Sequence, residues 1–360
     1  MRQFLSSITA LAALLLLTAC DVHQWPEPRY DYDFEVPEPP TPRITVPIRL
    51  EYETDFYLWE HKYDPLLGKV EEANPSLTLF PEFPGTSEKY DNTQSSGQIQ
   101  VYIKVFPSSD PTRCVAEQTF VSDINGTYDT DLQLEVPSED TYDVVVWSQL
   151  LQSPQAQPFY NALDFSRIRI ISDNYRGSTN YRDGFRGRIR IDAATKTYDS
   201  YVVRMKRPMG KFELVTTDLS EFLEKEGERR GLSARADAAD YRVIISFPYF
   251  YPNSYSAMDD RLENSISGIS FETSMRVTGD SEASLGFEYV MLNNINDNGV
   301  QTRVDVYRLD GTHVAGSAMF TIPMRRDNHT LLRGAFLSLE NSGGVGIDPG
   351  FNGDHNVTWQ

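Results

Sequence analysis

The feature that most constrains the fold of this chain is a two-residue alternation of apolar and polar side chains, which begins at residue 44. Gln98 to Phe106 (QIQVYIKVF) and Tyr241 to Phe247 (YRVIISF) are two examples. Because successive side chains of a strand point to opposite faces, this pattern is typical of strands with one buried face. Pro, Gly, Asn or Asp bounds each segment and favours a turn there. The predicted strands are 44–53, 98–106, 116–122, 128–136, 143–149, 185–193, 200–205, 211–216, 241–247, 268–277, 284–291, 301–307, 313–322 and 330–339.

Short strands separated by turns favour antiparallel β-sandwiches. Pro208 and Gly210 interrupt the series, and we therefore expect two all-β domains in tandem, an N-terminal one at 44–206 and a C-terminal one at 207–360. The length of the chain allows two domains. Residues 58–93 show no clean pattern, and we interpret them as a long irregular connection.

One short connecting helix is predicted after Asp218. Asp218 and Glu221 form a D-x-x-E capping arrangement, and Gly231 is a suitable stop. Leu219 and Phe222, with Leu223, give this helix one apolar face, which we expect to pack on a sheet. Farther along, Leu309 to Gly311 (LDG) predicts a hairpin turn, as does the NDNG stretch that begins at residue 296.

The N-terminal end has the features of an exported protein. Residues 1–19 combine a positive Arg2 with an apolar run that is too short to span a bilayer, and they are interpreted as a signal peptide. The stretch LTAC ends on Cys20 and is similar to the lipobox of bacterial lipoproteins, which predicts cleavage between Ala19 and Cys20 and acylation of Cys20 with palmitate-type chains. Seven prolines between residues 21 and 47 keep the backbone extended, so 20–43 is predicted to be a semi-rigid tether.

Composition excludes several classes of function. The net charge of −19 lacks the basic footprint of a nucleic-acid-binding protein. The five histidines are scattered, and the tail around Asp348 departs from the calcium-loop template, so we expect neither a metal nor a cofactor. No nucleophile elbow is present, and acidic pairs in a chain with 52 acidic residues occur by chance, so we expect no enzymatic activity. Cys114 is expected to be a buried small apolar residue.

Aromatic residues make up 12% of the chain, and most of them fit a strand-rich core. Three of them, Trp59, Tyr249 and Tyr251, are candidate ligand contacts, because exposed rings stack on sugars. The same stretch around Tyr249 equally fits packing at the end of a strand.

The joint at residues 207–219, RPMGKFELVTTDL, and the closing stretch that begins GGVGID at residue 343 resemble the Bacteroidales fimbrillin-type lipoproteins. These are the pilins and pilus-associated proteins of type V fimbriae. The resemblance implies tandem transthyretin-like β-sandwiches and a lipid-anchored location in the outer membrane, exposed at the cell surface. It also implies assembly with other fimbrial subunits, or with copies of this chain, by strand exchange.

In that family an arginine-specific protease can remove the first strand, and a strand from the next subunit fills the groove. The resemblance assigns the cut to Arg43, with Arg29 second. It assigns the donor strand to the C-terminal segment 345–360, in which the candidate residues are Val345, Ile347, Val357 and Trp359. Physically this is the addition of a strand to an incomplete sheet.

Two functions remain open at this stage. The first is a fimbrial subunit or fimbria-associated surface lipoprotein with a structural and adhesive role. The alternative is a surface glycan-binding lipoprotein of a polysaccharide-uptake system, with a possible host or glycan ligand. The first predicts that deletion of 345–360 abolishes assembly without unfolding the sandwiches. The alternative predicts polysaccharide binding that is lost when Trp59, Tyr249 or Tyr251 is replaced by Ala.

Overall fold

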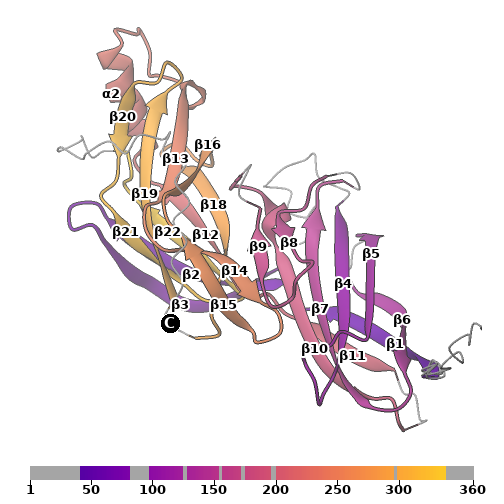
Figure 1. The fold of residues 1–360 in the computed structure, drawn as a ribbon. Coiled ribbons are helices and arrows are strands. Elements are labelled where there is room, and N and C mark those ends of the chain that lie inside the picture. The colour runs from indigo at the N-terminus through magenta and orange to yellow at the C-terminus, as the bar shows by residue number, and fades with distance from the viewer. Residues whose placement is uncertain are drawn as a thin grey trace, which may run out of the picture. The chain divides into compact units, whose positions relative to one another are not determined.

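The structure, a computed structural model, describes residues 41–81, 97–124, 128–153, 156–171, 175–195, 200–295 and 298–337. Within these residues the fold is all-β, apart from helix α2 (Leu219–Arg229) and two short 3-10 helices, η1 (Asn180–Arg182) and η2 (Ala238–Asp240) (Figure 1). The strands are β1 (Arg43–Tyr52), β2 (Asp55–Asp64), β3 (Lys69–Pro81), β4 (Gln98–Pro107), β5 (Ala116–Asp123), β6 (Thr130–Pro137), β7 (Thr141–Leu151), β8 (Tyr160–Asn161), β9 (Ile168–Ile170), β10 (Gly184–Asp192), β11 (Tyr201–Met205), β12 (Met209–Thr216), β13 (Tyr241–Phe247), β14 (Tyr251–Ser256), β15 (Arg261–Ile266), β16 (Ile269–Ser274), β17 (Arg276–Val277), β18 (Ala283–Met291), β19 (Asn298–Arg308), β20 (His313–Gly316), β21 (Phe320–Met324) and β22 (Asn328–Gly334).

The N-terminal sandwich consists of a three-stranded sheet, β11-β1-β6, and a four-stranded sheet, β10-β7-β4-β5. Alternate residues of β1, namely Val46, Ile48 and Leu50, are buried in one core with Val101 of β4 and Val146 of β7. Residues from both sheets therefore fill the space between them, as in a β-sandwich. The alternation in the sequence is what gives each sheet its apolar inner face.

The C-terminal sandwich pairs a six-stranded sheet, β17-β18-β12-β22-β2-β3, with the sheet β16-β13-β19-β20, to which β21 adds through β19. Every residue of β12 is buried. Phe212 and Leu214 from this strand share a core with Ile245 of β13 and Val304 of β19. The predicted helix α2 is confirmed, and its buried residues include the expected Leu219.

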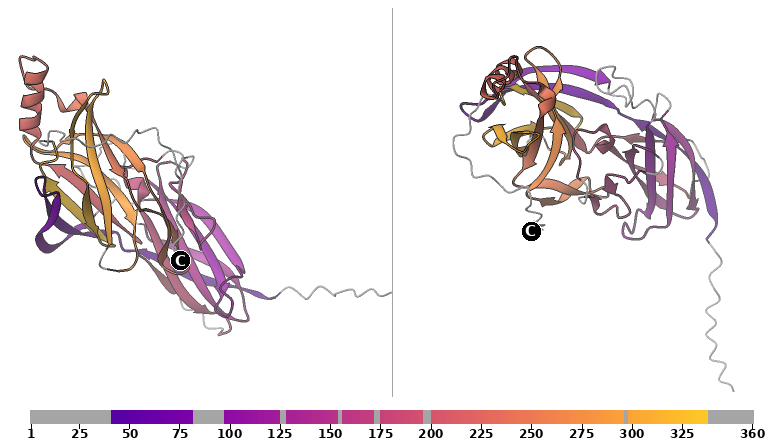
Figure 2. Two further views of the ribbon diagram at one scale, coloured as in Figure 1. Left: turned by 60° about the vertical axis from the view of Figure 1, so that its left-hand side comes forward. Right: turned by 90° about the horizontal axis from the view of Figure 1, so that it is seen from above.

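The two halves of the sequence are interwoven. Strand β2 lies beside β22 in a parallel ladder that places Trp59 opposite Thr330, so the indigo hairpin β2–β3 joins the strands coloured orange to yellow (Figure 2). Strand β9 pairs with β14, with Ile168 opposite Tyr255. Residues 55–81 thus belong to the sheet of the C-terminal sandwich, which differs from our expectation that 44–206 forms the N-terminal domain alone.

The expectation of an irregular connection from residue 58 is wrong as far as Pro81, because β2 and β3 occupy that stretch. Pairing of β2 with β3 shifts register on both sides of Glu60. This irregularity separates the buried residues Phe56 and Trp59 by three positions, and the next buried position holds a polar residue, His61. The two-residue pattern is broken there, and for this reason the strand could not be recognised from the sequence.

Most ladders are antiparallel, as predicted, but β1–β11, β12–β22 and β2–β22 are parallel. Of two further predictions, the Asp218 cap of α2 is wrong and the hairpin after β19 is correct. The carboxylate of Asp218 accepts hydrogen bonds from the hydroxyl of Thr216 and the backbone N–H of Leu337, and it does not cap α2. The hairpin after β19 is confirmed, with Gly311 at a φ of 91°.

Candidate functional site

Several predicted site residues lie outside the described residues. They are Ala19, Cys20, Arg29, Val345, Ile347, Val357 and Trp359, and their assignments stay predictions.

Arg43 is exposed and is the first residue of β1. Its guanidinium donates a hydrogen bond to the carbonyl oxygen of Glu135 at 3.0 Å. Strand β1 is the central strand of its sheet, since it pairs with β11 on one side and β6 on the other. The first strand is therefore fully built into the fold.

The expectation that a cut at Arg43 removes the first strand is wrong. Only Glu53 and Thr54 separate β1 from β2, and β2 is hydrogen-bonded inside the six-stranded sheet. A chain cut after Arg43, or after the earlier Arg29, keeps β1 covalently joined to β2. Such a cut releases the tether alone and opens no groove between β11 and β6.

The expectation of three exposed rings is wrong for two of them. Trp59 is 8% exposed, and its Nε1–H donates to Glu72 Oε1 at 2.8 Å. Tyr251 is 0% exposed, because β14 begins there and directs its ring into the core. Tyr249 precedes that strand and is 49% exposed. Of the three candidate rings, only Tyr249 is therefore exposed enough to stack on a sugar.

Cys114 is exposed, which is contrary to our expectation of a buried residue. It lies between β4 and β5, where the chain runs through polar turns, and its thiol donates to the carbonyl oxygen of Ala116 at 3.2 Å. Its side chain is accessible to small reagents.

The residues of the joint that follows β11 are closely packed. Arg207 is 1% exposed, its Nε lies 2.9 Å from Asp183 Oδ2, and its guanidinium lies 3.9 Å from the ring centre of Phe56. Gly210 leaves no space for a side chain, because a Cβ there would overlap the carbonyl oxygen of Arg325. Both residues serve to hold the chain where it passes from one sandwich to the other.

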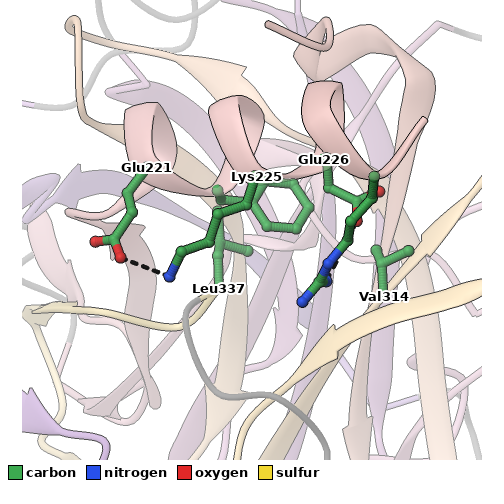
Figure 3. Close-up of a pocket in the computed structure, with 7 residues that line it drawn as sticks. Glu221, Lys225, Glu226, Val314 and Leu337 are labelled. Atoms are coloured by element: carbon green, nitrogen blue, oxygen red, sulfur yellow. Dashed lines mark hydrogen bonds and ion pairs between the residues drawn. The ribbon is translucent and has the colours of Figure 1, made fainter. Parts of the chain in front are cut away.

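Helix α2 covers a very small pocket (Figure 3). Its volume is about 20 Å³, which is room for about one water molecule. The buried carboxylate of Glu226 at its wall is already paired, since Arg308 Nη2 lies 2.8 Å from Oε2. Lys225 and Glu221 form an exposed ion pair at its rim (Figure 3). This pocket is unsuited to an organic ligand.

A larger groove, of about 560 Å³, lies where β10 and β11 meet the turns after β14 and β21. Six of its twelve lining residues are Arg or Lys and two are Asp, so its lining carries a formal charge of 6 − 2 = +4, whereas the whole chain carries −19. Burial raises the pKa of one of the acids, Asp327, to about 6. Sequence reasoning missed this site, because its residues come from five separate segments of the chain.

The described residues contain no cluster of His, Cys, Asp or Glu suited to holding a metal ion. In the same residues no helix has both the length and the apolar character needed to cross a membrane.

The fold and the site define this chain as a two-sandwich all-β protein with a cationic groove of about 560 Å³. A sequence model for a family of unknown function (DUF6562) matches residues 68–360, and the chain belongs to that family. No curated protein matches the sequence.

Solved structures of similar arrangement include a candidate adhesin from Bacteroides thetaiotaomicron, at a TM-score of 0.41 and 12% identity over 79% of this chain and 81% of the other. A candidate polysaccharide-binding protein from the same species has a TM-score of 0.39 and 11% identity over 76% and 80%. The fimbrial anchor protein Mfa2 from Porphyromonas gingivalis has a TM-score of 0.37 and 10% identity over 76% and 82%. These TM-scores are too low to transfer a function, and the specific resemblance to fimbrillins stays a prediction.

Proposed function

We propose that this protein is a lipid-anchored cell-surface protein of bacterial fimbriae, with a structural and adhesive role and no catalytic activity. Acyl chains on Cys20 would hold it in the outer membrane, since two or more buried chains make membrane attachment stable. The sequence supports the proposal through its lipobox, its proline-rich tether and the family resemblance of its joint and tail.

The observation that carries this proposal is the way in which the N-terminal end joins the fold. The predicted tether ends at Arg43, where β1 begins. Strand β1 pairs through five residues with β11 and through eight with β6. To detach β1 from the fold, both of these ladders would have to break. Such an attachment suits a protein that is moored to a membrane under force.

The lipid anchor can be tested by labelling growing cells with a palmitate analogue and treating intact cells with protease. The wild-type protein should carry the label, remain with the outer membrane and be digested from outside. Cys20→Ser should lose the label and leave the membrane fraction. An unlabelled wild-type protein, or one that external protease never reaches, would contradict the proposal.

We also propose that the protein keeps its first strand and joins other fimbrial subunits, or itself, by donating its C-terminal segment. Mass spectrometry of the surface form should find the acylated Cys20 at the N-terminus, and an N-terminus beyond Tyr52 would contradict retention of β1. For donation, Val357→Ser with Trp359→Ser should abolish the oligomer bands of an unboiled gel. Thr358→Ala is the matched control, because alternate residues of a strand face opposite sides.

A further inference from the structure

The cationic groove brings together four basic side chains from two strands. Arg186 and Arg188 stand two residues apart on β10, and Arg204 and Lys206 are two residues apart at the end of β11, so each pair shares a face. The backbones of Arg186 and Lys206 exchange two hydrogen bonds, of 2.8 and 2.9 Å, which set the two pairs side by side. The bridge between Arg186 and Lys206, which joins strands of two different sheets, therefore gathers the cations.

Part of this cluster is held rigidly. Arg186 Nε donates to the carbonyl oxygen of Ala257 at 2.9 Å. Across the groove, Arg326 donates to the carbonyl oxygen of Leu292 at 2.6 Å and to Asp260 Oδ1 at 2.6 Å. Both guanidiniums are oriented before any ligand arrives, which lowers the entropic cost of binding.

Another part of the cluster is open to a ligand. The side chain of Arg204 is exposed, and no hydrogen bond or ion pair engages it within the described residues. Lys206 lies 3.2 Å from Glu53, but both side chains are about half exposed, so this pair is weak. Like charges so close together repel one another, and an anionic ligand would relieve that repulsion.

The lining indicates which kind of anion fits. Guanidinium and ammonium groups bind carboxylate and sulfate groups through charge-assisted hydrogen bonds. Asp260 and Asn294 in the same groove can hydrogen-bond sugar hydroxyls, which the side chains of an acidic peptide do not offer. The lining contains no aromatic ring, which disfavours neutral sugars. A volume of about 560 Å³ is that of a site for an organic ligand and exceeds the size of a single inorganic ion.

We propose that this groove binds an acidic oligosaccharide through the carboxylate or sulfate groups of its sugars. The inference rests on the proposed location at the cell surface, where the protein would encounter such polymers. It names the class of ligand that the proposed adhesive role would use.

The test is calorimetric titration of the full-length protein in detergent with four probes. They are a heparin-derived tetrasaccharide, an oligogalacturonate that carries carboxylates alone, neutral cellotetraose and tetraglutamate. At least one acidic saccharide should bind, more weakly as salt is raised, and cellotetraose should not. Arg204→Gln with Lys206→Gln should weaken that binding about tenfold or more, because two charged contacts are lost.

The matched control is Arg113→Gln with Arg235→Gln, which removes two exposed charges outside the groove and should leave affinity unchanged. Equal weakening by both double variants, or no binding of either acidic saccharide, would overturn the proposal. Tighter binding of tetraglutamate, lost in the groove variant, would assign the groove to acidic peptides instead. The groove variant should still be lipidated and displayed at the surface, so failure of the proposed function would be seen separately in the labelling assay.

Discussion

Replacing Arg207 by Met should destabilise the fold by about 3–5 kcal/mol, the usual cost of removing one partner of a buried ion pair. The side chains of Arg207 and Asp183 are 1% and 5% exposed, and both carboxylate oxygens of Asp183 lie within 3.0 Å of the guanidinium Nε. Methionine can still pack against the ring of Phe56, but it leaves a buried negative charge without its guanidinium. At roughly 2 °C per kcal/mol for a chain of this size, the melting temperature should fall by about 6–10 °C.

Urea unfolding at neutral pH, followed by circular dichroism, measures this loss. Adding Asp183→Asn to Arg207→Met should restore about half of it, because the buried charge is then gone. The control is Arg204→Met, three residues upstream at an exposed position, which should change stability by less than about 0.5 kcal/mol. A loss below about 1 kcal/mol for Arg207→Met, or simple additivity in the double variant, would refute the argument.

Three further predictions concern titratable groups and thiols. Burial alone would raise the pKa of Glu213, but hydrogen bonds, first of all from His329, outweigh it and lower that pKa to about 2, from 4.5. The ionised carboxylate of Glu213 then stabilises the fold above pH 4.5, and this effect is lost as pH falls toward 2. Glu213→Gln should therefore lower the urea midpoint at pH 7 and hardly change it near pH 2. Equal losses at the two pH values would disprove this. Burial raises the pKa of Asp327 from 3.8 to about 6, so stability falls as pH rises through that range, and Asp327→Asn should add about 1–3 kcal/mol at pH 8 but nothing near pH 4. A loss of stability at pH 8 would contradict it. If Cys20 is acylated as proposed, a thiol reagent should modify one cysteine, the exposed Cys114, in the folded and in the unfolded protein. A second reactive thiol would show that Cys20 is unmodified.

Local pattern was enough to find most of the strands. In Tyr241–Phe247 the predicted and observed bounds coincide, because the burial of this strand alternates without interruption. Helix α2 was equally predictable, since its apolar residues repeat with helical spacing. In both elements the spacing of the apolar residues is enough to indicate the secondary structure.

Long-range pairing was beyond the reach of that pattern. Nothing local to β2 indicates that it will pair in parallel with β22, more than 250 residues later, or that a break in register will bury Trp59. The same holds for Tyr251, whose burial depends on where β14 begins and on which strands cover it. Aromatic residues serve cores and ligand sites equally well, so composition could not tell these roles apart.

Period, composition and short motifs are local properties, and they were enough to identify an acidic, all-β chain and to predict an export leader and a proline-rich tether. The folded structure was needed to show that a cut at Arg43 cannot free β1 and that Arg186, Arg204 and Arg326 line one groove. Both results depend on which strands lie side by side. Strand pairing joins residues that are distant along the chain, and it is settled when the shared core is packed.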